Sequence, residues 1–158
     1  MCGFIGVFEK NNHLKNNLNK INNCLKKFNY RGPDSRQIKS NNYGIIGFNR
    51  LAINYLSKGN QPKIFKSKNG HKEDSLLCFN GEIFNHKDLE KEFLSYPYTR
   101  DEVTILTELY KKFGLKFIKN LNGQFSIAII DTIDESLTLI RDPIGIRPLF
   151  FSFEKNKE

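Results

Sequence analysis

The chain has 158 residues, 39% of them hydrophobic and 27% charged, which is typical of one globular domain and excludes a disordered or fibrous chain. No apolar run approaches the roughly 20 residues needed to cross a bilayer, so no membrane partner is expected. The formal charge of +8 is spread along the chain without an arginine-rich arm, which favours a solvated basic surface over a nucleic-acid site. The N-terminus lacks the pattern of a signal peptide, and we expect a cytoplasmic protein.

The first eight residues alternate small and apolar positions as a buried strand does, and Cys2 stands at their start. If Met1 is removed, Cys2 carries both a thiol and a free α-amine. The reference pKa of that amine is roughly 7.7–8.0, so at neutral pH a useful fraction can accept the thiol proton. N-terminal threonine nucleophiles are activated in the same way. Cys2 is therefore a candidate nucleophile, and the alternative is that it merely follows the initiator methionine.

The other cysteines and the histidines point to no further chemistry. Cys2, Cys24 and Cys78 are odd in number and far apart, which argues against a disulfide framework. Neither the cysteines nor the three histidines show the spacing of metal ligands, so we expect no metal site.

A helix is predicted over about 14–28, because apolar residues recur there at intervals of three and four. These residues are Leu14, Leu18, Ile21, Leu25 and Phe28. Cys24 lies beside this stripe and is interpreted as a small core residue. The helix is expected to stop at 30–35, where Gly32 and Pro33 disfavour helical geometry.

Residues 43–53 are predicted to be extended, with Asn49 and Arg50 interrupting the apolar pattern. Arg50 either lies on the solvent face or turns toward a carboxylate. Residues 54–75 are polar and are interpreted as a long connection.

An apolar strand over 76–79 runs into Asn80, Gly81 and Glu82, a sharp turn signal that is typical of a tight hairpin. Helices are predicted over about 86–94 and 102–113, the second ended by Gly114, and a shorter one over about 115–121.

The last part of the chain is predicted to form strands over 124–131 and 137–140, paired across the turn between them. A corner rich in proline and glycine over 141–148 leads to a final strand over 149–153. The order of strands, helix, strands, helices and strands predicts an α+β domain with a mostly antiparallel sheet.

Six motifs in this order resemble the glutaminase domain of class II glutamine amidotransferases, whose nucleophile is N-terminal. The motifs are Cys2-Gly3-Phe4-Ile5-Gly6, Arg31-Gly32-Pro33-Asp34-Ser35, Asn49-Arg50-Leu51-Ala52-Ile53, Gln61-Pro62, Asn80-Gly81-Glu82-Ile83-Phe84-Asn85-His86 and Arg141-Asp142-Pro143-Ile144-Gly145-Ile146-Arg147-Pro148-Leu149. The second and fifth are most similar to the asparagine synthetase family. The resemblance runs from Cys2 to about Phe151, nearly the whole chain.

This resemblance implies a four-layer αββα sandwich of two antiparallel sheets, of the Ntn-hydrolase type. It also implies that residues 1–158 form a single glutaminase domain that hydrolyses L-glutamine to glutamate and ammonia. Carried over residue by residue, the Cys2 thiol attacks the side-chain amide and its α-amine moves the proton. The Asn80 side chain and the Gly81 backbone N–H match the family's oxyanion hole.

The resemblance also implies how glutamine is bound. Arg50 matches the arginine that holds the α-carboxylate, and the backbone at Ile53 lies on the same wall. Glu82 and a later acidic residue would hold the α-ammonium group. Counting back from Leu109-Tyr110 puts Glu102 at that later position, whereas a slip of one residue puts Asp101 there, and both stay candidates.

The chain also departs from the family pattern. Tyr30 stands where a histidine is common, and the Ser-Gly-Gly-x-Asp-Ser loop of the ATP-using synthetase half is absent. We therefore expect no cofactor for the glutaminase step, ATP and Mg²⁺ belonging to the absent half. The expected partner is a synthetase domain or subunit that accepts ammonia. The chain ends soon after the last predicted strand, so the domain is expected to be shortened at its C-terminus. The alternative function is a catalytically degenerate domain that binds glutamine or a partner protein.

Overall fold

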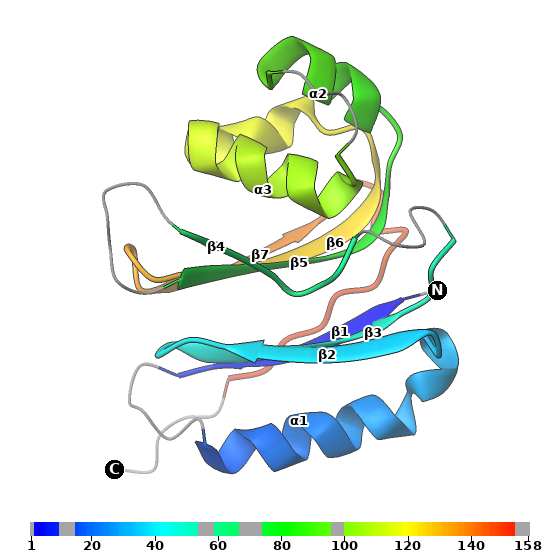
Figure 1. Ribbon diagram of the computed structural model, residues 1–158, viewed down its shortest axis with the longest axis vertical. Coiled ribbons are helices and arrows are strands. Elements are labelled where there is room, and N and C mark those ends of the chain that lie inside the picture. The colour runs from blue at the N-terminus through cyan, green and yellow to red at the C-terminus, as the bar shows by residue number, and fades with distance from the viewer. Residues whose placement is uncertain (1, 10–14, 54–58, 67–73, 96–99, 154–158) are drawn as a thin grey trace.

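The fold is a stack of four layers, as predicted (Figure 1). The computed structural model describes residues 2–9, 15–53, 59–66, 74–95 and 100–153. Sheet A is antiparallel, in the order β1 (Gly3–Phe8), β3 (Gly44–Arg50), β2 (Ser35–Ser40). Sheet B is antiparallel, in the order β4 (Lys63–Lys66), β5 (Asp74–Ile83), β6 (Gly123–Asp131), β7 (Ser136–Arg141).

The helices cover the outer faces of the two sheets. Figure 1 shows α1 (Lys15–Lys27) on sheet A, and α2 (His86–Phe93) and α3 (Glu102–Phe113) on sheet B. Two 3₁₀ helices, η1 (Asn29–Arg31) and η2 (Gly114–Asn120), connect these elements. The arrangement is an α+β sandwich of the Ntn-hydrolase type. No helix in the described ranges has the length and apolar character to span a membrane.

Helix α1 packs on sheet A through the predicted stripe. Ile21 and Leu25 are buried with Ile45 of β3. The buried side chain of Asn49 donates from Nδ2 to the Leu25 carbonyl at 2.7 Å and so ties the end of α1 to β3. The predicted helix is confirmed within one residue of its C-terminal end, and Leu14 lies outside the described residues.

The two sheets pack face to face through a cluster that includes Phe48 of β3, Cys78 of β5 and Ile130 of β6. Gly44 lets them approach closely, since a Cβ there would lie 2.4 Å from the Cδ1 atom of Ile130. A second, larger core joins sheet B to α3 and η2 and contains Leu106 and Phe117.

Helix α3 matches its prediction because both of its ends carry strong signals. Asp101 caps its N-terminus by accepting from the Thr104 N–H at 3.0 Å, and Gly114 ends it with φ 58°. Helix α2 also agrees with its prediction within one residue. The helix predicted over 115–121 is instead the 3₁₀ turn η2.

Three other expectations need correction. The Asn80-Gly81 pair makes no hairpin, because β5 runs straight through it and Gly81 pairs with Phe125 of β6. The polar stretch over 54–75 contains β4 and the start of β5, while its residues 54–58 and 67–73 lie outside the described ranges. Residues 149–153 form no strand: Phe150 and Phe153 are 90% and 87% exposed, so no sheet covers their apolar side chains.

Candidate functional site

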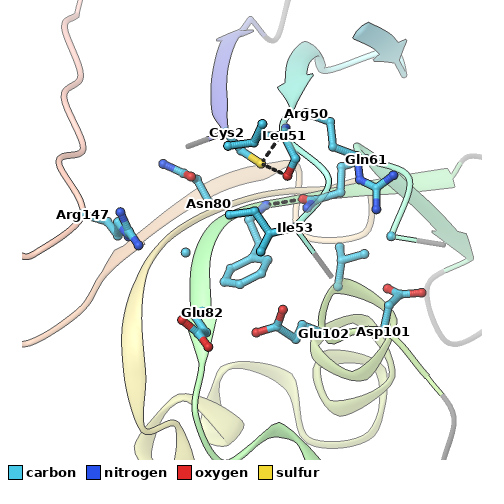
Figure 2. Close-up of a pocket in the computed structure, with 14 residues that line it drawn as sticks. Cys2, Arg50, Leu51, Ile53, Gln61, Asn80, Glu82, Asp101, Glu102 and Arg147 are labelled. Atoms are coloured by element: carbon cyan, nitrogen blue, oxygen red, sulfur yellow. Dashed lines mark hydrogen bonds between the residues drawn. The ribbon is translucent and has the colours of Figure 1, made fainter. Parts of the chain in front are cut away.

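One pocket of about 200 Å³ contains all eight residues that the sequence singles out (Figure 2). They come from the start of β1, the end of β3 and the segment after it, the C-terminal part of β5, and the start of α3. The residues are Cys2, Arg50, Ile53, Asn80, Gly81, Glu82, Asp101 and Glu102. The volume is below the roughly 300–1,000 Å³ of pockets for drug-sized ligands, which favours a small metabolite.

Cys2 is half-buried, and its sulfur lies against the backbone that follows β3. The Leu51 N–H donates to Sγ at 3.2 Å, and the thiol lies 3.5 Å from the Leu51 carbonyl oxygen. Arg31 Nε donates to the Cys2 carbonyl at 3.3 Å. These contacts fix the position of the sulfur at the wall of the pocket.

The environment of Cys78 is the opposite of that of Cys2. Cys78 is fully buried between the sheets, and this burial raises the pKa of its thiol well above the usual value. Because the thiolate is the nucleophilic form, Cys78 is inert at neutral pH. Cys24 is half-buried on α1 and does not line the pocket.

On the edge of β5 that faces the pocket, the Gly81 N–H lies between two N–H groups, those of Phe79 and Ile83, that are bonded to side chains. The Phe79 N–H donates to Gln61 Oε1, and the Ile83 N–H donates to Glu102 Oε1, both at 2.7 Å. N–H groups of alternate strand residues point to the same edge, so the Gly81 N–H points that way as well. The bonds of Phe125, which lies opposite Gly81 on β6, are consistent with this direction. The N–H and the carbonyl of Phe125 both bond to Asp142 and not to Gly81.

Gly81 is required at this position. Its φ is 151°, a conformation that residues with a side chain rarely adopt. A Cβ there would lie 2.0 Å from the Gln124 carbonyl oxygen and 2.7 Å from the Phe125 Cα. The close approach of β6 therefore explains the glycine of the Asn-Gly pair.

The carboxylates occupy the end of the pocket opposite the thiol. Figure 2 shows Glu82 and Glu102 pointing into this end, with Asp101 turned away from them. Both oxygens of Asp101 accept from the Thr104 hydroxyl at 3.0 Å. Of the two candidates for the later acid, Glu102 is therefore the one whose carboxylate faces Glu82.

Burial is the main cause that raises the pKa of Glu102. The Ile83 N–H and His86 oppose this shift, whereas the charges of Glu82 and Asp101 add to it. The charged form of Glu102 is thus costly in the empty pocket, and a cation placed between Glu82 and Glu102 would stabilise it.

Arg50 and Ile53 form another wall of the pocket. Arg50 is the half-buried last residue of β3, and its guanidinium passes so close to Gly59 that a Cβ there would lie 3.3 Å from Nη2. Ile53 is 75% exposed at the rim. Arg50 therefore lines the pocket. The sequence left open whether its side chain lies on a solvent face or turns toward a carboxylate.

No role was assigned from the sequence to the six other lining residues, of which Leu51, Gln61 and Arg147 bring polar groups to the pocket and Gly59, Phe79 and Val103 do not. Gln61 and Arg147 stand in the motifs that carried the resemblance, but spacing alone did not place their side chains. The Leu51 contact uses a backbone N–H, which leaves no signal in the residue type.

Arg147 reaches the pocket through a turn built on Asp142. The Ile146 and Arg147 N–H groups donate to the Asp142 carboxylate at 2.9 and 3.0 Å, as does the Phe125 N–H at 3.2 Å. Burial alone would raise the pKa of Asp142, but these N–H groups and that of Gly145 outweigh it and lower the pKa to about 2. The carboxylate stays charged at neutral pH and fixes the turn.

No three His, Cys, Asp or Glu side chains gather as metal ligands would among the described residues. The pocket instead combines a thiol, the Asn80 amide, the Gly81 backbone N–H, two arginines and three carboxylates, of which Glu82 and Glu102 point into it. This donor set can hold a small zwitterion and place one of its carbonyl groups beside the thiol.

The sequence model of the glutamine amidotransferase domain matches residues 1–158, and the chain belongs to this family. A provisionally named glutamine-hydrolysing asparagine synthetase 2 of Methanocaldococcus jannaschii is 30% identical over 172 residues, covering 99% of this chain and 33% of that protein. The glutamine-hydrolysing asparagine synthetase 1 of Arabidopsis thaliana is 27% identical over 154 residues, and the match covers 97% of this chain and 26% of that protein.

A third relative, the glutamine-hydrolysing asparagine synthetase 2 of Bacillus subtilis, is 34% identical over 129 residues. That match covers 81% of this chain and 17% of the relative. The chain thus spans at most a third of the length of these relatives.

Proposed function

We propose that this chain is the glutaminase domain of a glutamine-dependent amidotransferase and that Cys2, once Met1 is removed, is its nucleophile. The reaction releases glutamate and ammonia, and an asparagine-synthetase-type half outside these 158 residues accepts the ammonia. The observation that carries the proposal is the convergence of the thiol of Cys2 with the Asn80 and Gly81 donors in one pocket. Membership in the family and the names of the relatives support the substrate.

The first step is addition of the thiolate to the side-chain carbonyl carbon of glutamine. The free α-amine of Cys2 takes the thiol proton, and the Leu51 N–H holds the sulfur at the wall of the pocket. The carbonyl oxygen becomes an oxyanion that accepts from the Asn80 amide and the Gly81 N–H. Each donor of this kind typically contributes about 3–4 kcal/mol to the stability of the transition state.

The second step is loss of ammonia. The C–N bond breaks as the α-ammonium group returns its proton to the leaving nitrogen, which leaves a thioester on Cys2. Water then attacks the thioester: the α-amine of Cys2 takes one proton from the water and passes it to the sulfur as the C–S bond breaks, which releases glutamate and restores the thiol. Each of the two half-reactions moves one proton through the α-amine, and neither uses a cofactor, while ATP and Mg²⁺ would serve the synthetase half.

Free glutamine is recognised by its two backbone charges. The Arg50 guanidinium matches the α-carboxylate, because its planar fork can donate two parallel hydrogen bonds. Glu82 and Glu102 hold the adjacent α-ammonium group at the end of the pocket away from the thiol, and Asp101 supports them as the helix cap. A glutamine inside a protein has neither charge and is excluded.

The test is release of ammonia and glutamate from L-glutamine by protein whose mature N-terminus is confirmed by intact mass. We expect Cys2→Ala to abolish release, because no other cysteine lines the pocket. Cys24→Ala is the matched control and should keep the wild-type rate. Arg50→Ala should raise KM by about 10- to 100-fold, as expected for loss of a charged hydrogen bond.

Ammonia release by Cys2→Ala at the wild-type rate would refute the proposal. Glutamine binding in calorimetry with no ammonia produced, from protein with a confirmed free Cys2, would instead support a catalytically degenerate glutamine-binding domain.

A further inference from the structure

The short segment before β4 holds the edge of β5 by a side chain instead of by backbone pairing. β4 begins at Lys63, which pairs with Leu77 of β5. If that antiparallel register continued, Gln61 would lie opposite Phe79. In the described residues the ladder stops at Lys63, and Gln61 Oε1 accepts the Phe79 N–H at 2.7 Å. The side-chain carbonyl replaces the backbone carbonyl that a longer β4 would supply.

This substitution opens the edge of β5 where the pocket needs it. A backbone partner at position 61 would extend β4 along β5 and cover the edge toward Gly81. Because Gln61 reaches β5 with its side chain, the next N–H on that edge, that of Gly81, faces the pocket. Glu102 bonds the following N–H, that of Ile83. Gln61 and Glu102 therefore hold the strand on both sides of the free donor.

Gln61 is also well fixed itself. Its side chain is only 8% exposed, and its neighbour Pro62 is buried. Phe79, whose N–H it accepts, is only 4% exposed. A buried N–H that lost its partner would cost free energy, and the strand would move to recover a hydrogen bond.

We propose that Gln61 is a positioning residue of the glutaminase reaction: its hydrogen bond to Phe79 sets the peptide units from which Asn80 and Gly81 present their donors. This inference rests on the function proposed above. Gln61 acts through the backbone of β5, so its loss should weaken the transition state more than the binding of glutamine. Displacement of catalytic groups by about 1 Å can cost about 100-fold in rate.

The kinetic test compares Gln61→Leu, which keeps volume but removes the acceptor, with Gln61→Glu, which keeps an acceptor oxygen at the same reach. We expect Gln61→Leu to lower kcat by about 10- to 100-fold with KM within about threefold of wild type. Gln61→Glu should recover a large part of kcat. Gln37→Leu, on β2 and outside the pocket, is the matched control and should leave both constants unchanged.

A second readout needs no turnover. In protein that carries Cys2→Ala, amide hydrogen exchange at Phe79 should be faster by about tenfold or more with Gln61→Leu, because the N–H has lost its partner. Gln61→Glu and Gln37→Leu should keep the slow exchange. In the same background, the shift of the Gly81 amide resonance on addition of L-glutamine should shrink with Gln61→Leu.

The outcomes separate this inference from the proposed function. Wild-type protein that releases no ammonia would overturn the proposed function, whereas the exchange at Phe79 would still report the hydrogen bond. Faster exchange with kcat unchanged would overturn the positioning role. A rise in KM alone would make Gln61 a binding residue and overturn it as well. If Gln61→Leu does not fold, Gln61→Met takes its place with the same criteria.

Discussion

The surroundings of Glu102 have opposing effects on the pKa of its carboxyl group. One oxygen accepts the Ile83 N–H at 2.7 Å, which favours the charged form, while burial and the nearby charge of Glu82 disfavour it. Ionisation of Glu102 therefore costs more in the folded protein than in the unfolded chain, which is why burial raises its pKa. The cost is absent below the unfolded pKa of about 4.3 and is fully present above the folded pKa.

We therefore predict that Glu102→Gln stabilises the empty protein and weakens its binding of glutamine. The amide oxygen can still accept the Ile83 N–H, but the charge is gone. The melting temperature should rise relative to wild type at pH 7 and show no difference near pH 3.5, as measured by calorimetry. KM should rise by about 10- to 100-fold through loss of one charged hydrogen bond.

Asp101→Asn is the comparison for that prediction, because Asp101 faces Thr104 and not Glu82. It should leave the helix cap largely intact, because asparagine caps a helix about as well as aspartate, and should change KM by less than Glu102→Gln does. The reverse order of KM effects would show that Asp101 is the residue that meets the substrate.

At the level of single residues, most of the polar lining of the pocket could be predicted from the sequence. All eight candidates line it, because residues with distinctive chemistry at fixed spacing can be matched to a family without knowledge of the fold. Which of Asp101 and Glu102 faces Glu82 could not be predicted from the sequence, since neighbouring residues at a helix start point in different directions. The Leu51 N–H contact was beyond sequence reasoning because every residue except proline has that group.

Among the elements, α1 and β3 are joined by a buried polar contact. Asn49 of β3 donates to the Leu25 carbonyl and accepts from Arg36 Nε at 3.1 Å. Asn49 has no exposed surface, so both partners depend on it. This contact fixes the strand whose next residue is Arg50 of the pocket.

We predict that Asn49→Ala lowers the free energy of unfolding by about 1–3 kcal/mol, because it leaves a buried carbonyl at the end of α1 without its donor. Urea denaturation measures the loss. Asn42→Ala, on the exposed turn between β2 and β3, is the control and should stay within about 0.5 kcal/mol of wild type. Equal effects from the two variants would argue against the contact.

Helices were easier to predict than edge strands. The stripe of α1 and the capping residues of α3 follow from local chemistry. β2 and β4 escaped prediction because these two edge strands, SRQIKS and KIFK, carry few apolar residues, whereas the edge strands β1 and β7 are apolar enough to predict. The Asn-Gly signal misled because Gly81 serves close packing against β6 instead of a turn.

For the whole molecule, the decisive fact is that the pocket is divided between the two sheets. Cys2 directly precedes β1 and Arg50 ends β3, both strands of sheet A, whereas Asn80, Gly81 and Glu82 belong to sheet B. Side chains between the sheets therefore set the distance from nucleophile to oxyanion donors. Phe48 is the largest fully buried member of that layer.

We predict that Phe48→Ala costs about 3–5 kcal/mol of stability through lost burial and the cavity it leaves. That is a large share of the roughly 5–15 kcal/mol that holds a domain folded. Phe48 does not line the pocket, but it packs between the two sheets that do. The rate of glutamine hydrolysis by Phe48→Ala should therefore be lower than that of wild type even at temperatures where circular dichroism shows a folded protein. Phe150→Ala, at a side chain that is 90% exposed, is the control for both measurements.

The division of the pocket also has a consequence in time. Among the residues that line the pocket, Cys2 is synthesised first and Arg147 last. At about 5–20 residues per second, ribosomal elongation separates these two events by roughly 7–30 s. Throughout that interval the N-terminus cannot be enclosed by a finished pocket, so an aminopeptidase can reach it. In the proposed mechanism, the nucleophile would be unmasked before the site that uses it exists.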